Sequence, residues 1–312
     1  MEKSAISVKG LVKNYNGFTA LKGISFEVPK GSFFGYLGPN GAGKTTTINA
    51  ITGLANFDAG SVHVMGFDVI DDYIDARKSI GFSQQDLIFD PVLNVREILL
   101  FQAGYYGIEK KDAEPRVAEL LKFFGLKESG EKNFRQLSGG MKRKLQIAKA
   151  LVHDPKVLVL DEPTAGVDVE LRHTLWNYLR KLNKEGMTIL LTTHYIEEAE
   201  KLCDTIGIIS RGEIVALEGK EKLVSSIHKP KLRITLKEPL KKAPKNIEKN
   251  SIIEREGMLI EVECENAEKE LASVLTSLSE EGAQVSGINI VKQKLEDVYL
   301  KLTGEGNELD RL

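Results

Sequence analysis

The chain has 312 residues, of which 42% are hydrophobic and 28% are charged, and its formal net charge is −2 at pH 7. This length suits one large domain plus a smaller one, and the composition is typical of globular proteins with a sizeable core. The nearly balanced charge argues against a nucleic-acid partner, because nucleic acids are usually bound by strongly basic domains or stripes. No apolar run approaches the ~20 residues of a membrane-spanning helix, and the first residues lack the pattern of a secretory signal. We therefore expect a chain that does not cross a bilayer.

Two cysteines, Cys203 and Cys264, lie far apart in the sequence and in no metal-ligand spacing. We expect both to be buried, reduced thiols of a cytosolic protein.

The first predicted elements are strands. Ile6–Lys9 and Ile24–Val28 alternate apolar and polar residues with polar turns between them, which predicts antiparallel strands at the edge of a domain. Phe33–Leu37 has the pattern of a buried strand and runs directly into a glycine-rich turn. Residues Thr45–Leu54 then have helical character.

A helical pattern extends from about Asp86 to Phe134. Asn94 and Glu97 have the spacing of a capping box, in which each side chain bonds the other residue's backbone N–H. Apolar residues then recur at helical spacing, at Val117, Leu120, Leu121 and Phe124.

Strands and helices alternate after this segment. A helix is predicted from about Gly140 to Val152, a buried strand at Val157–Leu160, a helix opened by Asp168, and a second buried strand at Thr188–Thr192. Such alternation predicts a parallel sheet covered by helices, and therefore an α/β fold.

The character of the sequence changes near Ser225. A lysine- and proline-rich stretch covers Lys237–Lys249, and residues 224–312 are predicted to form a separate small α+β domain. Its predicted elements are strands at Lys231–Leu236, Met258–Cys264 and Val285–Val291 and helices at Ala267–Glu281 and Leu295–Leu302.

A phosphate-binding loop is the strongest local signal. The pattern G-x-x-x-x-G-K-[ST] follows a predicted strand and precedes a helix, as its mechanism requires. Glycines let several backbone N–H groups point at one anion, and the helix N-terminus adds positive potential. Lys44 is expected to reach the β- and γ-phosphates, and the Thr45 hydroxyl to bind Mg²⁺. The nucleotide-binding residues predicted here are Gly38, Pro39, Asn40, Gly41, Ala42, Gly43, Lys44, Thr45 and Thr46.

Two adjacent carboxylates, Asp161 and Glu162, end the apolar strand Val157–Leu160. A carboxylate at the C-terminal end of a strand beside a phosphate loop belongs on the magnesium side of the site. Asp161 is therefore expected to hold Mg²⁺ or its waters. Glu162 is a candidate general base for the attacking water, an effect worth about 10²- to 10⁴-fold in rate.

A second candidate phosphate site is the sequence Leu137-Ser-Gly-Gly-Met141. It places a serine hydroxyl and glycine N–H groups at the start of a helix. Because it lies far along the chain from Lys44, it need not serve the same bound nucleotide.

Together these motifs resemble the nucleotide-binding domain of ATP-binding-cassette (ABC) proteins. The resemblance covers residues 5 to about 222, and the LSGG sequence is nearly diagnostic of the family. It implies a P-loop fold over residues 1–223, with a parallel core sheet, an antiparallel β subdomain and a helical subdomain at about 86–150. It also implies a head-to-tail dimer that holds two ATP molecules, each between the phosphate loop of one subunit and the LSGG sequence of the other.

The resemblance implies further roles in binding the subunit's own nucleotide. Tyr15 would stack on adenine, and Gln85 would contact Mg²⁺ and sense a membrane partner. The neighbouring Gln84 could take this place by a shift of one residue. His194 would hold the γ-phosphate and the attacking water, so the predicted catalytic residues are Lys44, Glu162 and His194.

Other implied roles act on the second subunit. Ser138, Gly139 and Gly140 would bind the γ-phosphate held by the partner, and Asp168 would communicate across the dimer. This sequence departs from many relatives at Met141, where glutamine is usual, and at Val167, where leucine is usual. Neither residue is among those that contact phosphate, so activity is expected to survive.

The segment Leu295–Gly304 resembles the closing motif of the ATPase subunits of ABC-2-type exporters, as do Ala103–Gly107 and Thr192–Glu200. The resemblance implies ATP and Mg²⁺ as cofactors, a second ATPase copy, identical or related, and a separate permease that docks around Asp86–Val95. It also implies a peripheral location at the cytoplasmic face of the membrane. Two alternatives stay open: the motor of an importer, and an ABC ATPase that remodels ribosomes or DNA. The C-terminal domain could also simply brace the dimer.

Overall fold

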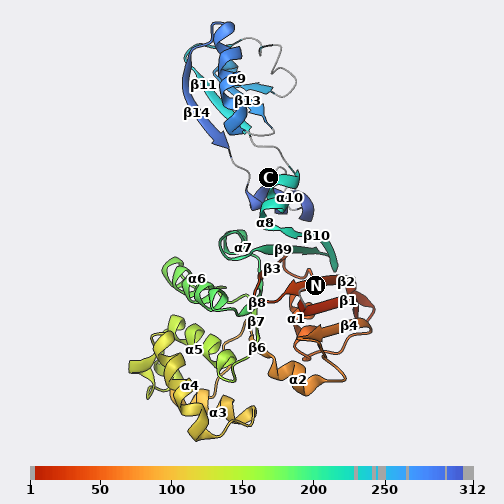
Figure 1. The fold of residues 1–312 in the computed structure, drawn as a ribbon, viewed down its shortest axis with the longest axis vertical. Coiled ribbons are helices and arrows are strands. Elements are labelled where there is room, and N and C mark those ends of the chain that lie inside the picture. The colour runs from red at the N-terminus through yellow and green to blue at the C-terminus, as the bar shows by residue number, and fades with distance from the viewer. Residues whose placement is uncertain are drawn as a thin grey trace. The chain divides into compact units, whose positions relative to one another are not determined.

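The computed structural model describes residues 4–227, 231–240, 244, 251–264, 267–291 and 294–304. The chain divides into two compact units (Figure 1). The first unit comprises the residues up to Lys220 together with those from Leu302 onward, and the second unit comprises Glu221–Lys301. Among the described residues, no helix combines the length and the apolar character that crossing a bilayer requires.

A six-stranded sheet forms the centre of the first unit. Its strands are β3 (Phe33–Leu37), β6 (Ile80–Ser83), β7 (Val157–Asp161), β8 (Thr188–Thr193), β9 (Thr205–Ser210) and β10 (Glu213–Gly219). They lie in the order β10-β9-β3-β8-β7-β6, and all pair in parallel except β10 with β9. Every residue of β3, β7 and β8 is buried, because strands of a parallel sheet covered on both faces are apolar throughout. The predicted parallel sheet is confirmed.

An antiparallel sheet lies at one side of this unit. Its strands are β1 (Ser4–Tyr15), β2 (Phe18–Pro29), β4 (Ala59–Val64) and β5 (Phe67–Asp68), in the order β2-β1-β4-β5. Phe26 of β2 stacks on Phe34 and Tyr36 of β3, with ring centroids 5.5 and 5.3 Å apart. The two sheets therefore share one hydrophobic core, and the predicted antiparallel strands are confirmed.

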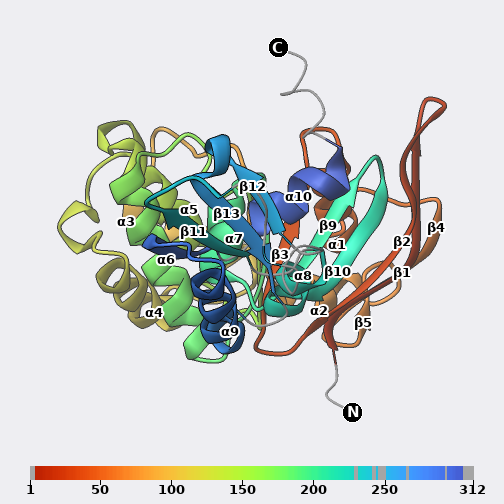
Figure 2. The ribbon, with the colours of Figure 1, turned by 90° about the horizontal axis from the view of Figure 1, so that it is seen from above.

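The helices between residues 95 and 184 lie on the opposite side of the first unit from β1, β2 and β4 (Figure 2), whereas the helices at Lys44–Ile51 and Tyr73–Lys78 contact strands of the antiparallel sheet. The helices of this unit are α1 (Lys44–Ile51), α2 (Tyr73–Lys78), α3 (Val95–Tyr105), α4 (Lys110–Phe123), α5 (Gly139–Leu151), α6 (Val169–Lys184) and α7 (Ile196–Leu202). Two short 3₁₀ turns, at Lys127–Ser129 and Phe134–Gln136, precede α5. Helices α3 to α5 fall in the range predicted for the helical subdomain.

The predicted capping box at the start of α3 is confirmed. The Asn94 side chain accepts a hydrogen bond from Glu97 N at 2.8 Å, and Glu97 Oε2 accepts one from Asn94 N at 2.9 Å. The expectation of helix from Asp86 onward was wrong, since residues 86–94 contain no helix. Pro91 disfavours helical backbone at Asp90, and the Asn94 cap sets the first residue of α3.

The second unit is built on a four-stranded antiparallel sheet. It contains β11 (Lys231–Leu236), β12 (Ser251–Glu254), β13 (Leu259–Glu263), α9 (Ala267–Glu280) and β14 (Val285–Val291), together with most of α8 (Lys220–Ile227) and of α10 (Leu295–Thr303). The strand order is β12-β13-β11-β14. Leu232, Ile234 and Ile260 form a core with Val274 and Leu278 of α9. Strands β11, β13 and β14 and helices α9 and α10 were predicted, whereas β12 and α8 were not. Most of Lys237–Lys249 lies outside the described residues, and the assignment of residues 224–312 to an accessory domain stays a prediction.

Both cysteines are buried and unpaired, as predicted. Burial raises the pKa of the Cys203 thiol well above its usual range. This thiol is therefore kept in its protonated, poorly nucleophilic form.

Candidate functional site

The phosphate loop joins β3 to α1. The buried ammonium group of Lys44, whose residue is only 5% exposed, donates to the carbonyl oxygens of Gly38 at 2.8 Å and Pro39 at 3.2 Å. Gly43 has φ +111°, and a Cβ atom there would lie 2.8 Å from Leu21, so the turn requires glycine. The loop thus curls around the lysine at a helix N-terminus, where backbone N–H groups favour anions.

The predicted cation site lies at the C-terminal end of β7. Parallel pairing places Asp161 beside Thr192 of β8, and the Thr192 hydroxyl donates to Asp161 Oδ1 at 2.5 Å. A side-chain hydrogen bond also joins Thr45 to Asp161. Burial raises the pKa of the Asp161 carboxyl, and the hydrogen bonds from Thr192 and Thr45 partly oppose this. A carboxylate beside a threonine hydroxyl supplies the oxygen ligands that Mg²⁺ prefers, so these residues fit the cation.

Three predicted site residues converge on the Glu162 carboxylate. Lys44 Nζ lies 3.4 Å from Oε1. Gln85 Nε2 donates to Oε2 at 3.4 Å, whereas the side chain of Gln84 lines a separate pocket. His194 Nδ1 lies 3.1 Å from Oε2, although the angles are not those of a hydrogen bond. The structure therefore brings together the lysine, the glutamine and the histidine around one carboxylate.

The backbone of Glu162 is in the left-handed region, with φ +46°. Its N–H donates to the carbonyl oxygen and the hydroxyl of Thr192, both at 3.1 Å. A non-glycine residue in this region costs about 1–3 kcal/mol unless its surroundings hold it there. The turn after β7 is therefore held in a conformation that aims the carboxylate at Lys44.

Tyr15 lies at the end of β1 and is 43% exposed. Lys13 Nζ is 4.8 Å from the centroid of its ring. A half-exposed ring in this position offers a face to a planar base, but its contact with adenine stays a prediction.

The signature loop is Leu137–Met141, and its residues from Ser138 onward line a second hollow of about 440 Å³. Ser138 caps α5 by accepting from Met141 N at 3.3 Å, and Asp168 caps α6 by accepting from Leu171 N at 2.8 Å. Both caps line this hollow, and, within the described part of the chain, none of the phosphate-loop residues does. One copy of the chain therefore does not bring the signature loop to its own phosphate loop.

Residues 21–165 match the model of the ABC transporter family. The linearmycin resistance ATP-binding protein LnrL of Bacillus subtilis (strain 168) is 36% identical over 305 residues, which cover 96% of this chain and 98% of that protein. The chain belongs to the ATP-binding subunits of ABC transporters. Nod factor export ATP-binding protein I of Burkholderia orbicola (strain AU 1054) is 43% identical over 226 residues, covering 72% of this chain and 74% of that protein.

Solved structures of ABC ATPases share the fold of the first unit. The ATP-binding subunit of an ABC transporter is 29% identical with a TM-score of 0.66, over 72% of this chain and 93% of that one. A dimeric ATP-binding cassette in a post-hydrolysis state, bound to ADP and Pi, is 27% identical with a TM-score of 0.63, over 69% of this chain and 98% of that one. This ABC chain is therefore an ATPase.

The sequence interpretation missed two residues of this ABC site. Thr192, which holds Asp161, was taken only as part of a buried strand; the signal was a hydroxyl residue at the C-terminal end of an apolar run. Arg143, a buried cation in α5, was not considered. The pair Arg143 and Gln146, spaced i,i+3 on the apolar face of a helix, was the signal for it.

Proposed function

We propose that this ABC ATPase drives an exporter: two copies close head to tail around two ATP molecules, and hydrolysis reopens them to move a separate permease. The observation that carries the proposal is the convergence of Lys44, Gln85 and His194 on Glu162, together with a signature loop that lines a different hollow. The names of two relatives, one for Nod factor export and one for linearmycin resistance, support the direction of transport.

In the proposed mechanism, the phosphate loop and Lys44 bind the β- and γ-phosphates of ATP. Glu162 accepts a proton from the attacking water, and His194 orients that water and the γ-phosphate. Thr45, Asp161 and Gln85 would hold Mg²⁺, which neutralises charge on the phosphates during transfer. Glu162 contributes because its carboxylate is desolvated and held by its neighbours, so little reorganisation is needed.

Dimerisation would complete the site. Ser138 and the N–H groups of Gly139 and Gly140 form an anion site at the start of the 13-residue helix α5. Gly140 also lets α5 approach α6, since a Cβ atom there would lie 2.8 Å from Leu171. Because Asp168 lines the same hollow, closure would place it and the signature loop against the partner's nucleotide.

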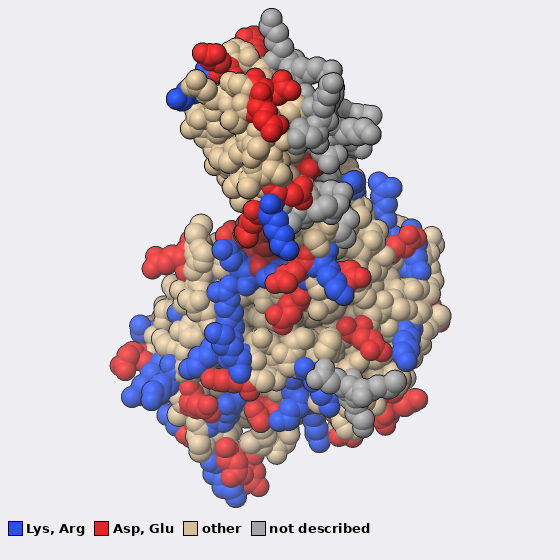
Figure 3. All heavy atoms as spheres, turned by 45° about the horizontal axis from the view of Figure 1, so that its top comes forward, with Lys and Arg blue, Asp and Glu red and all other residues tan. Residues whose placement is uncertain are grey.

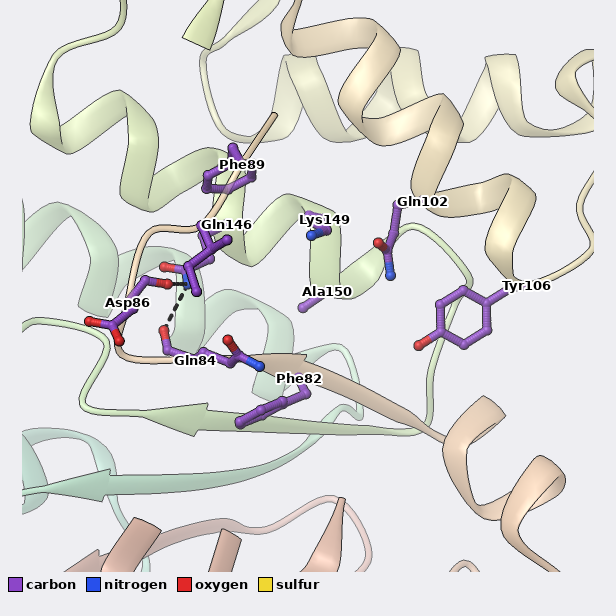
Figure 4. A pocket seen from close by; sticks show the side chains of 10 residues that line it. Phe82, Gln84, Asp86, Phe89, Gln102, Tyr106, Gln146, Lys149 and Ala150 are labelled. Carbon is purple, nitrogen blue, oxygen red and sulfur yellow. Dashed lines mark hydrogen bonds between the residues drawn. The ribbon is translucent and has the colours of Figure 1, made fainter. Parts of the chain in front are cut away.

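The proposed permease site is the coupling groove, a pocket of about 300 Å³ between the segment after β6 and helices α3 and α5 (Figure 4). Phe82, Phe89 and Tyr106 provide apolar walls, and Asp86 and Lys149 provide charge. Ile88, which lines the groove, is an exposed apolar side chain, and the exposed Tyr105 lines an adjoining hollow together with Gln102 and Tyr106. A groove of this kind suits the apolar side of a short amphipathic helix, such as a cytoplasmic segment of a permease would offer.

Replacing Ile88 by aspartate is expected to abolish capture of the permease while leaving ATP hydrolysis unchanged. Ile88 is 69% exposed and lines the groove, so a carboxylate there would have to be desolvated on docking. The measurement is affinity capture from detergent-solubilised membranes of the source cell, with identification of multi-span membrane proteins by mass spectrometry. Leu54→Asp, also at an exposed apolar residue, is the matched control. Equal capture by the Ile88 variant and the unmodified chain would place the docking site elsewhere.

The same capture experiment separates the alternative functions. Recovery of a substrate-binding protein with the permease would indicate an importer, and recovery of ribosomes without a permease would indicate a remodelling ATPase. The face in Figure 3 carries Lys and Arg side chains side by side with Asp and Glu side chains. Because basic and acidic side chains lie together on this face, the prediction that nucleic acid is not a partner stands as a prediction.

We also propose a peripheral location at the cytoplasmic face of the membrane.

A further inference from the structure

Arg143 occupies an unusual place for a charged residue. It lies one turn into α5, the helix that the signature loop opens, and is only 4% exposed. Burial lowers the pKa of its guanidinium, while the carboxylates of Asp86 and Glu198 act to raise it. A buried cation destabilises the fold unless its donors are hydrogen-bonded, so the hydrogen-bond acceptors around Arg143 indicate its role.

One end of the guanidinium holds the segment that leads into the coupling groove. Arg143 Nη1 donates to the carbonyl oxygen of Gln85 at 2.9 Å and to that of Gln84 at 3.4 Å. It also donates to Gln146 Oε1 at 2.9 Å. Gln146 in turn donates from Nε2 to the carbonyl oxygens of Gln84 at 2.8 Å and Asp86 at 2.7 Å (Figure 4). Two side chains of α5 therefore hold the backbone of residues 84–86.

The other end of the guanidinium holds the turn of the candidate base. Arg143 Nη2 donates to the carbonyl oxygen of Glu162 at 3.5 Å and to that of Ala165 at 3.4 Å. This is the turn whose Glu162 backbone is in the left-handed region. Because backbone in that region persists only where its surroundings hold it, removal of these bonds is expected to let the carboxylate move.

We propose that Arg143 is a positioning residue, which fixes the backbone of Gln84–Asp86 and the turn of Glu162 to one another. Through this connection, a partner bound in the coupling groove changes the position of the Glu162 carboxylate. Residues 84 and 86 line that groove, and Gln85 contacts the Glu162 carboxylate directly. The planar fork of arginine is needed, because its two terminal nitrogens reach two separate segments at once, whereas a lysine ammonium is a single point. The proposal rests on the role proposed for Glu162.

The first test compares Arg143→Lys and Arg143→Met with the unmodified chain in steady-state ATP hydrolysis and thermal unfolding. Both variants are expected to lose about 10- to 100-fold in kcat, the effect of a base displaced by about 1 Å. The KM for ATP should change by less than about threefold, since the phosphate loop is untouched. Arg180→Met, which removes an arginine–carbonyl bond of 2.7 Å at the surface of α6, is the control and should match the unmodified chain.

A purely structural role makes a different prediction. If Arg143 only stabilised the fold, Arg143→Lys, which keeps the charge and most of the volume, would match the unmodified chain in both stability and kcat. Wild-type kcat in a stably folded Arg143→Lys protein would overturn the proposal.

The second test measures hydrogen exchange of the nucleotide-free chain, which needs no activity. Arg143→Lys is expected to raise exchange in peptides covering both residues 84–86 and residues 162–165. Gln146→Leu should raise exchange only in the peptides that cover residues 84–86. Within these two segments, the Gln146 amide contacts only Gln84 and Asp86. Unchanged exchange at residues 162–165 in Arg143→Lys would also overturn the proposal. If Glu162→Gln instead hydrolyses ATP normally, the role of Glu162 fails while the exchange result stands.

Discussion

Replacing Glu162 by glutamine lowers the rate of ATP hydrolysis by roughly 10²- to 10⁴-fold, the usual contribution of a positioned general base. Glutamine keeps the size of the side chain and an oxygen that can accept from Gln85, but it cannot take a proton from water. Lys44, at 3.4 Å, is free to bind phosphate in this variant because it no longer pairs with a carboxylate. The variant is therefore expected to bind ATP at least as well as the unmodified chain.

An assay of phosphate release measures the rate of hydrolysis, and titration with a fluorescent ATP analogue measures the affinity for ATP separately. Glu185→Gln, at an exposed carboxylate that ends α6, is the matched control and should hydrolyse ATP normally. A Glu162→Gln protein that turns over at the wild-type rate would show that another group accepts the proton.

Replacing Lys44 weakens ATP binding itself. Charge-assisted hydrogen bonds from a lysine are worth about 1.5–3 kcal/mol, so the affinity for ATP is expected to fall by about 10- to 100-fold. Hydrolysis should fall further, because Lys44 also faces Glu162, whose buried carboxylate would be left without its cation. Lys44→Met, which retains the aliphatic volume, accompanies Lys44→Ala so that a packing defect is recognised.

Titration with the fluorescent analogue gives the affinity of each variant. Lys30→Ala, at an exposed lysine that follows β2, serves as the control. Undiminished turnover in both Lys44 variants would contradict the assignment of the phosphate loop.

Features with a local cause could be predicted from the sequence. The turn around Lys44 follows from glycines between a buried strand and a helix. The cap of α3 follows from the spacing of Asn94 and Glu97, and the cap of α6 follows from Asp168. The parallel sheet followed from apolar runs of strand length, because strands buried on both faces cannot alternate.

Features that depend on tertiary contacts could not be predicted. Thr192 meets Asp161 only because β7 and β8 pair in one register, 31 residues apart in the chain. The carbonyl oxygens around Arg143 come from two segments remote from α5, and any residue type can supply a carbonyl. By contrast, the non-helical course of residues 86–94 has a local cause that the helical prediction overlooked, since Pro91 disfavours helical backbone at Asp90 and the Asn94 cap begins α3.

The solution mass of Glu162→Gln in ATP and Mg²⁺, measured by light scattering after size exclusion, tests most directly whether two copies enclose the nucleotide. The account predicts twice the 34.6-kDa mass of the chain with ATP, and the single mass without it.

Adding Gly139→Asp should restore the single mass. A Cβ atom at Gly139 meets nothing within 4 Å, and a carboxylate is favourable at a helix N-terminus, so the fold is kept while phosphate is repelled. Gly104→Asp, where a Cβ atom also meets nothing within 4 Å, is the control and should leave the dimer intact. A single mass for Glu162→Gln at saturating ATP, or an undisturbed dimer with aspartate at position 139, would contradict the account.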